Sequence, residues 1–501
     1  MQKHSQNSKA MLHLASSIYF TKEFVFHYSL QYNTFYKGDE HQMKKFSFLT
    51  RKKSRDVDMT EGSIMRHLIN FAIPLLVGNI FQQLYNMVDT WVVGNYVSNE
   101  AFSAVGSLGP IANMLIGIFM GLSSGAGVVI SQYYGAKRYD KVQDTVHTSI
   151  VMTLVLAALF TVIGIFMTPY MLHFMKTPDN VFPESKTYLT IYFAGIIGLM
   201  IYNIGSGILR AVGDSKRPFY FLVVSAVLNT VLDLLFVLVF HMGVAGVALA
   251  TIIAQGVSAV LVLIALLRSH SCIRLEVRRL KMHWDMLGKI IKVGIPAAIQ
   301  MAITSFSNVF VQSYINFFGA DCMSGWTAYA KIDQLILLPM QSLALSSTTF
   351  VGQNLGRNLV DRAKKGIRIS LFMSIAATLI LMLPVILFAP SLVAFFNNKP
   401  EVIEYGTLML RWLSPFYVLC CVNQIYSGAL RGAGDSRAPM VILLCSFVFF
   451  RQAYLYIMAN YISNTIIPIG MAYPAGWLLA SILTLIYFKK AKLNKNRLVE
   501  D

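Results

Sequence analysis

The chain has 501 residues, of which 55% are hydrophobic and only 13% carry a charged side chain. Soluble domains carry about 25% charged residues, so this composition excludes an ordinary soluble domain and indicates a membrane protein. The net charge of +18 would suggest nucleic-acid binding in a soluble chain. Here the basic residues stand between apolar segments, where they orient a membrane protein, and we expect no nucleic-acid partner. The five cysteines show no metal-ligand or disulfide spacing.

Residues 1–58 are polar and basic, unlike the rest of the chain. Their one apolar patch, AMLHLASSIYF, is too short to cross a membrane and is interrupted by His13. We expect a disordered cytoplasmic tail or an upstream extension of the gene model. The second interpretation is favoured by Met59, which opens the stretch MTEGSIMRHLINFAIP and resembles a natural start.

Twelve apolar segments follow this tail, each long enough for the roughly 20 residues that a transmembrane helix needs. They lie at 68–94, 104–134, 143–168, 187–209, 218–240, 243–267, 287–318, 327–353, 366–388, 402–430, 438–458 and 463–488. We therefore predict an all-α integral membrane protein with twelve transmembrane helices.

Lys and Arg are distributed unequally between the loops. They are frequent in alternate loops, namely 135–142, 210–217, 268–286, 354–365 and 431–437, whereas the loops on the other side hold only Lys176, Lys186 and Lys399. Both termini are basic as well. Because cytoplasmic loops carry the excess of Lys and Arg, we expect a multi-pass protein of the cytoplasmic (inner) membrane with both termini in the cytoplasm.

Three stretches of the first half recur in the second half at an offset of 221 or 222 residues. LRAVGDSKRP at 209–218 matches LRGAGDSRAP at 430–439, QYYGAKRYDK at 132–141 matches QNLGRNLVDR at 353–362, and AIPLL at 72–76 matches GIPAA at 294–298. Such a period indicates a duplicated unit. It predicts two six-helix bundles, 59–267 and 287–488, joined by a cytoplasmic linker at 268–286 and followed by a basic cytoplasmic tail at 489–501. Because six is even, the bundles should be related by a pseudo-twofold axis along the membrane normal.

The repeated Leu-Arg-Gly-Asp loop has the residues of a tight turn. Gly213 with Asp214, and Gly434 with Asp435, favour a turn that connects two helices. We interpret both copies as structural turns, with a gate-forming role as the alternative.

Buried carboxylates are the first candidates for coupling transport to an ion gradient, because each is costly inside a membrane. Asp89, Asp233 and Thr251 lie at similar depths in their predicted helices, roughly 9–12 Å below the outer surface at 1.5 Å per residue. Asn229 lies one turn before Asp233 and shares its face. Two carboxylates, an amide and a hydroxyl suit sodium or a proton. The alternative is that both aspartates only form hydrogen bonds to neighbouring helices.

The twelve segments, the twin LR[AG]xGDS[KR]xP loops and VDTWVVG at 88–94 together resemble the multidrug and toxic compound extrusion (MATE) family. The resemblance covers about residues 60–490. It implies an antiporter that exports structurally varied, often cationic organic compounds, driven by inward movement of sodium or protons. It also implies a cation site in the N-terminal half, at the positions of Asp89, Asn229, Asp233 and Thr251. Pro74 matches a proline that bends the first helix in some members, with a static kink as the alternative.

The second half lacks the corresponding carboxylates. The offset places Val311, Phe450 and Tyr454 at the positions of Asp89, Asn229 and Asp233. One branch of the family has a second cation site, whose acidic positions correspond here to Thr304 and, less directly, Cys420. We therefore expect asymmetric coupling. For Asp333 the sequence leaves open a local ion pair with Lys331, a place in the cavity or a part in coupling, and Arg451 is expected to pair with a carbonyl or an acid.

Four further polar residues are candidates for a substrate cavity in the N-terminal half. Gln82 and Tyr85 share the helix face of Asp89, Gln255 lies one turn after Thr251, and Asn203 lies in the segment 187–209. Polar packing between helices is the alternative for each.

The closest rival function is a lipid-linked oligosaccharide flippase of the same superfamily, which would need several arginines inside the membrane to hold phosphates. Only Arg411 and Arg451 are candidates for that task. An enzyme is disfavoured because the sequence has neither HExxH nor a spaced histidine cluster. A channel is disfavoured because the two halves carry unequal charge. We expect no cofactor, no metal beyond a coupling sodium ion, and a monomer that contacts membrane lipid and small organic substrates.

Overall fold

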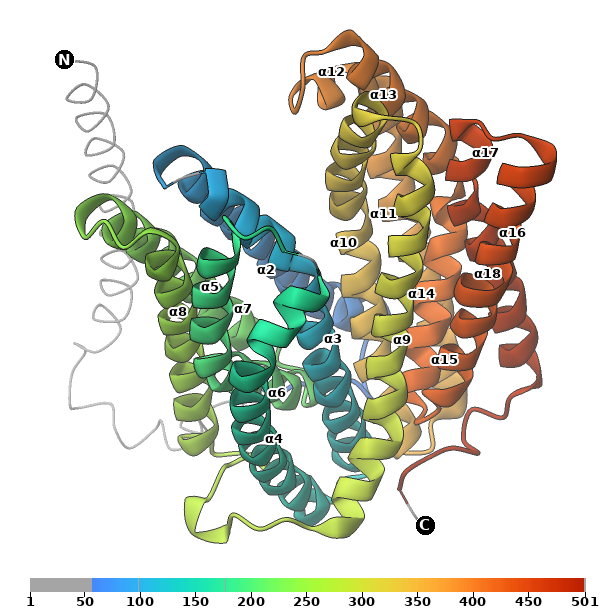
Figure 1. Cartoon of the computed structure of the whole chain (residues 1–501). Helices are drawn as coiled ribbons and strands as arrows, with labels where there is room; N and C mark the ends of the chain where they lie inside the picture. The colour runs from blue at the N-terminus through green and yellow to red at the C-terminus, as the bar shows by residue number, and fades with distance from the viewer. Residues whose placement is uncertain (1–55, 98, 176, 500–501) are drawn as a thin grey trace, which may run out of the picture. The chain divides into compact units, whose positions relative to one another are not determined.

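The computed structural model describes residues 56–97, 99–175 and 177–499. Within these residues the regular structure is helical, and eleven helices are long and apolar enough to cross a membrane, while the bent pair α5–α6 supplies a twelfth span (Figure 1). The predicted all-α membrane fold is confirmed. All twelve predicted segments fall on these helices.

The N-terminal half contains seven α-helices, because one predicted span is broken. They are α2 (Ile64–Tyr96), α3 (Asn99–Gly135), α4 (Tyr139–Phe174), α5 (Phe182–Ala194), α6 (Ile196–Ala211), α7 (Lys216–Leu234) and α8 (Gly243–Leu267). The segment 187–209, which we predicted as one helix, bends by 47° between α5 and α6. Gly195 stands at the bend, where a Cβ atom would lie 2.4 Å from the Ile252 side chain on α8. A wider π-helical turn, Leu235–Val239, follows α7.

The C-terminal half is built in the same order with more interruptions. Its helices are α9 (Trp284–Asn316), α10 (Ala320–Gly356), α11 (Val360–Leu387), α12 (Ala389–Ala394), α13 (Pro400–Leu413), α14 (Tyr417–Gly432), α15 (Arg437–Leu443), α16 (Arg451–Ile457), α17 (Ile466–Gly470) and α18 (Ala472–Lys490). Two π-helical segments, Leu444–Phe450 and Met458–Ile462, flank α16. Pro415 separates α13 from α14 inside the predicted span 402–430.

The duplicated loops have the same backbone conformation in both halves. Lys137 and Asn358 both adopt a positive φ, at 58° and 60°, and Gly213 and Gly434 do so at 85° and 88°. Asp214 accepts hydrogen bonds from the backbone N–H groups of the two residues that begin α7, and Asp435 does so near the start of α15. The structure therefore supports the interpretation as structural turns. We call the end of the bundle that carries these lysine- and arginine-rich loops the basic end.

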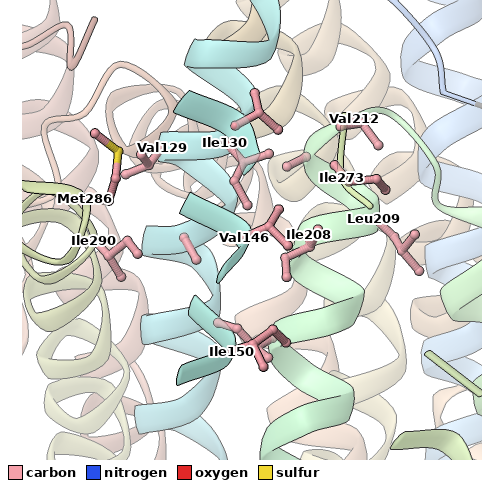
Figure 2. Close-up of a cluster of buried hydrophobic side chains, with 14 of the residues drawn as sticks. Val129, Ile130, Val146, Ile150, Ile208, Leu209, Val212, Ile273, Met286 and Ile290 are labelled. Carbon is pink, nitrogen blue, oxygen red and sulfur yellow. The ribbon is translucent and has the colours of Figure 1, made fainter. Parts of the chain in front are cut away.

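The largest core of the N-terminal half lies toward the basic end (Figure 2). Val129 and Ile130 of α3, Val146 of α4 and Ile208 of α6 are fully buried there. Ile273 of the predicted linker joins the same cluster, together with Met286 and Ile290 at the start of α9. A short 3₁₀ turn, Val277–Arg279, follows Ile273. The linker is thus anchored in the core by its apolar residues, while its basic residues stay at the surface.

The first helix of each half begins against the opposite half. Leu68, Phe71 and Leu75 of α2 pack against Phe350 of α10, whereas Val92 lies farther along α2 among residues of its own half. In the same way α9 begins in the N-terminal core, and Val311 and Ile315 join the C-terminal core. Gly121 and Gly125 of α3 allow this approach, because a Cβ on either would lie within 2.6 Å of the α9 backbone. Pro74 and Pro296 stand in the stretches where the two helices pass from one half to the other.

The described parts of both predicted tails are packed against the bundle. The backbone N–H of Val57 donates to the carbonyl of Val212 at 2.9 Å. Near the other end of the chain, Leu493, Leu498 and Val499 are buried. The described residues of these two segments therefore contact the bundle. Residues 1–55, 500 and 501 lie outside the described residues.

Candidate functional site

Asp89 of α2 and Asp233 of α7 come together in the structure. Their carboxyl groups lie close enough to influence each other electrostatically. The pairing follows from the packing of α2 against α7 and α8, where Val92, Val237 and Val247 belong to one buried valine cluster. Because this cluster is apolar, the two carboxyl groups lie in a setting that solvates charge poorly.

Several polar atoms of this site are buried without a hydrogen-bond partner in the described part of the chain. They are both carboxyl oxygens of Asp233, one oxygen of Asp89, and both the amide nitrogen and oxygen of Asn229. Buried groups of this kind are rarely left unpaired, since each costs about 1–3 kcal/mol. Two carboxylates can hydrogen-bond each other only when one of them holds a proton, and otherwise they repel. A proton between the carboxyl groups, or a small cation with oxygen ligands, would satisfy these carboxyl oxygens.

Thr251 is placed beside this group less directly. It follows Val247 of the valine cluster by one turn of α8 and is buried, but its hydroxyl donates to the Val247 carbonyl of its own helix at 3.0 Å. The hydroxyl oxygen retains its lone pairs and remains a candidate ligand. The structure therefore joins Asp89 with Asp233, places Asn229 one turn away on α7, and leaves Thr251 as a peripheral member.

Two tyrosines of α5, Tyr188 and Tyr192, were missed by the sequence analysis. Their rings stack at a centroid distance of 6.2 Å, and Tyr188 lies within electrostatic range of Asp89 and Asp233. The spacing of four residues between two tyrosines inside a predicted span was the signal available in the sequence. It was overlooked because the bend that brings α5 over the site is a tertiary feature.

The predicted cavity residues fall into two groups. Tyr85 interacts with Gln82 on its own helix and lies near Asp89, and Gln255 interacts with Tyr192. These three residues therefore share one polar, aromatic region with the aspartates. Asn203 is different, because its amide donates to the Leu199 carbonyl of α6 at 2.9 Å. Asn203 lies where α6 packs against α3, and the Ser123 hydroxyl of α3 donates to its backbone carbonyl.

The second half has no carboxylate at the corresponding positions. Val311 is buried among apolar residues, and Thr304 donates to the Gln300 carbonyl of its own helix. Cys420 is buried in the C-terminal core with a free thiol.

Asp333 and Arg451 are two charged residues of the second half whose roles the sequence left open. Asp333 accepts hydrogen bonds from the hydroxyls of Tyr417 and Tyr329, while Lys331 is exposed. Arg451 was expected to pair with a carbonyl or an acid.

In the structure the guanidinium of Arg451 donates to the side-chain carbonyl of Asn308 at 3.0 Å, one of the two expected kinds of partner, and to the Ser307 hydroxyl at 2.9 Å. It lies 4.8 Å from the ring centres of both Phe447 and Tyr473. Cation–π contact and neutral hydrogen-bond acceptors thus replace the acid.

The same duplication is seen when the chain is compared with known families. The profile of the MatE family matches two stretches, residues 74–235 and 296–457. The chain belongs to the MatE family. The two matches begin and end at corresponding positions of the two halves, which agrees with the repeat found in the sequence.

Curated relatives cover nearly the whole length of the bundle. The probable multidrug resistance protein YpnP of Bacillus subtilis is 28% identical, with 89% of this chain and 99% of that protein covered. The probable multidrug resistance protein NorM of Thermotoga maritima is 24% identical, with 86% of this chain and 94% of that protein covered.

A solved structure described as the outward-facing conformation of a multidrug resistance MATE family transporter is 22% identical. It has a TM-score of 0.83 and covers 88% of this chain and 98% of its own. At this identity the likeness concerns the fold.

These findings confirm the predicted family and the two-bundle membrane fold. Members of the MatE family are transporters of small molecules rather than enzymes, so the prediction that the chain is not an enzyme is confirmed. This MatE chain is a multi-pass membrane protein. The flippase alternative finds no support among these relatives.

Proposed function

We propose that this MatE protein is a cation-coupled antiporter that exports organic, often cationic compounds across the cytoplasmic membrane by alternating access. The observation that carries the proposal is the pair formed by the half-buried Asp89 and the buried Asp233, with unpartnered polar atoms around them. The names of the curated relatives, which include multidrug resistance proteins, support the substrate class. Sodium and protons both suit the oxygen atoms of the site.

Occupancy of the site changes the force between two helices. When both carboxyl groups are ionised, Asp89 and Asp233 repel each other across a poorly solvated space, and a proton or sodium ion removes this repulsion. Asp89 lies on α2, whose first turns pack against α10 of the other half. Ion binding can therefore bias how the two halves are held together.

Pro74 provides the flexibility that this coupling needs. Proline cannot donate to the carbonyl of Asn70 one turn earlier, which weakens α2 at that point. The weak point lies within the stretch of α2 that packs against the C-terminal half, before the part that carries Asp89. We propose that α2 bends here during the transport cycle.

The energy for export is supplied by the ion. One charge that moves inward across 100 mV releases about 2.3 kcal/mol. Since about 1.4 kcal/mol corresponds to a tenfold ratio, one charge supports a roughly fiftyfold gradient of a neutral substrate. The basic end would face the cytoplasm, because its loops carry most of the Lys and Arg. We propose a monomer in contact with membrane lipid, with Gln82, Tyr85 and Gln255 along the substrate path beside Tyr188 and Tyr192.

The site can be tested with charge-neutral variants. Asp89→Asn and Asp233→Asn should each abolish dye efflux from vesicles with an imposed pH or sodium gradient, because the site can then no longer bind and release a positive charge. Asp333→Asn is the matched control, since Asp333 is bound by two tyrosines, and should reduce efflux much less. Protein levels in the membrane are measured in parallel. Efflux against a gradient by both single variants would refute the proposed site.

A further inference from the structure

The repeated motif Gln-x2-Gly-x4-Asp-[Lys/Arg] lies where the two halves meet at the basic end. Its first copy begins at Gln132 in the last turns of α3, and its second at Gln353 in the last turns of α10. Both glutamine side chains are 0% exposed. The cation site does not involve either of them, so the motif needs a separate explanation.

The amide nitrogen and the amide oxygen of Gln132 both form hydrogen bonds with residues of the C-terminal part of the chain. Its Nε2 donates to the carbonyl of Gly432, the last residue of α14, at 2.8 Å. Its Oε1 accepts from the backbone N–H of Leu498 at 2.8 Å. One side chain of the first half therefore holds the end of a helix of the second half and the segment that follows α18.

Gln353 makes the same pair of bonds in the opposite direction. Its Nε2 donates to the carbonyl of Ala211, the last residue of α6, and its Oε1 accepts from the backbone N–H of Met59, both at 2.9 Å. Ala211 and Gly432 occupy equivalent places in the two halves. The four bonds thus form a symmetric set that joins each half to the other and to one terminal segment.

The glycine of the motif brings the two helices close enough for these bonds. A Cβ atom on Gly135 would lie 1.9 Å from the Gln353 carbonyl oxygen, and one on Gly356 would lie 2.0 Å from the Gln132 carbonyl oxygen. No side chain fits in either place without separating α3 from α10. The Gln-x2-Gly spacing therefore accounts for both the contact and the hydrogen bonds.

The contact between α3 and α10 at this point is made by polar groups, so it can open and close reversibly. Beside it lies a cavity of about 20 Å³, lined by small polar residues that include Ser131, Thr348 and Thr349. A space of this size holds one water molecule. If the halves separate here, water can take over the bonds of both amides and of the backbone groups that they bind, so opening leaves no polar group unpaired.

We propose that Gln132 and Gln353 form a symmetric latch that keeps the basic end closed in one state of the transporter and must release when that end opens. The latch also assigns a role to the segments around Met59 and Leu498, which are its backbone partners. It goes beyond the proposed cation site, because it concerns the closed end of the protein and is independent of which ion drives transport.

The latch is tested by measuring the distance between the halves at the basic end. Spin labels are placed at Asp140 and Asp361, exposed residues at equivalent positions at the starts of α4 and α11. In otherwise unchanged, detergent-purified protein, the Gln132→Leu/Gln353→Leu double variant should gain a population with a longer distance. The ratio of the longer-distance to the shorter-distance population should rise roughly fivefold for each glutamine replaced. This factor corresponds to losing the net stabilisation of one typical buried hydrogen bond in the closed state.

Gln452→Leu is the matched control. Gln452 is a glutamine of α16 whose amide bonds to Ser307 and to the Phe447 carbonyl inside one half, so its loss should leave the distance distribution unchanged. If the leucine double variant does not fold, the Gln132→Asn/Gln353→Asn variant decides, because the shorter amide stays polar but cannot reach both partners. An unchanged distribution in the folded variants, or an equal shift in Gln452→Leu, overturns the latch. Neither result bears on Asp89 and Asp233.

Discussion

Asp233 and Arg451 are buried side chains of opposite charge, and they differ in how many of their polar atoms have partners. Asp233 is 0% exposed and has no partner for either oxygen apart from the neighbouring Asp89 carboxyl group. Arg451 is 1% exposed and is bound by a hydroxyl, an amide and two aromatic rings. A site that must bind and release an ion needs unsatisfied atoms, whereas a charge that stays in place needs a complete set of contacts. Arg451 therefore has the surroundings of a structural residue.

The structural role of Arg451 predicts a loss of stability on a conservative change. Arg451→Lys keeps the charge but loses the planar group that lies between Phe447 and Tyr473 and reaches Asn308. We expect the free energy of unfolding to fall by about 1–3 kcal/mol, as for a buried hydrogen-bonding group left unpaired. Thermal unfolding of the purified protein measures this change. Arg411→Lys is the control, because Arg411 is exposed, and an equal effect of both variants would contradict the prediction.

At the scale of elements, α2 belongs to both halves. Its first turns are hydrogen-bonded and packed onto the C-terminal half, and Ser346 of α10 donates to the Leu68 carbonyl at 3.2 Å. Arg362 of α11 donates to the carbonyls of Met59 and Gly62 just before α2 begins. The segment before α2 is therefore part of the link between the halves. Its removal should lower the stability of the bundle.

Two N-terminal truncations separate the packed segment from the rest of the tail. Removal of residues 1–58 deletes Val57, which donates to Val212, and Asp56, whose carboxylate lies 3.9 Å from Arg217. We expect this protein to unfold at a lower temperature than one that lacks only residues 1–55, with a difference of about 1–2 kcal/mol. Both proteins are compared by thermal unfolding in the same detergent. Equal stability would show that residues 56–58 contribute nothing to the bundle.

At the scale of the whole molecule, the duplication determines the orientation of both halves together. Each half contributes six spans, so equivalent loops lie at the same end of the bundle. The latch glutamines, the twin turns and both described terminal segments all lie at this basic end. The orientation of the whole protein can therefore be tested at two equivalent loops.

Single cysteines at Lys137 and at Lys364 test the orientation in intact cells. If the basic end faces the cytoplasm, both should react with a maleimide only when it can cross the membrane. Native Cys272 lies in the linker, where burial and, to a smaller extent, Asp56 raise the pKa of its thiol to about 12, so little thiolate is present at pH 7.5 and its background reaction is slow. Labelling of either cysteine by an impermeant reagent from outside would overturn the assigned orientation.

The sequence by itself determined the features that depend on local chemistry. Hydropathy defined the twelve spans, the 221-residue repeat defined the two bundles, and the depth of Asp89 and Asp233 in their helices indicated one site. These signals survive without a structure, because a membrane requires long apolar helices and penalises every charge inside them.

Only the tertiary structure decided which groups meet across the halves. The start of α2 against α10, the approach of Tyr188 to the aspartates, and the partners of Arg451 all depend on helix packing and on the bend at Gly195. The repeat marked Gln132 and Gln353 as equivalent, but their partners are backbone groups of the opposite half. Every residue except proline has the same backbone N–H and C=O groups, so no residue type in the sequence identifies such a partner.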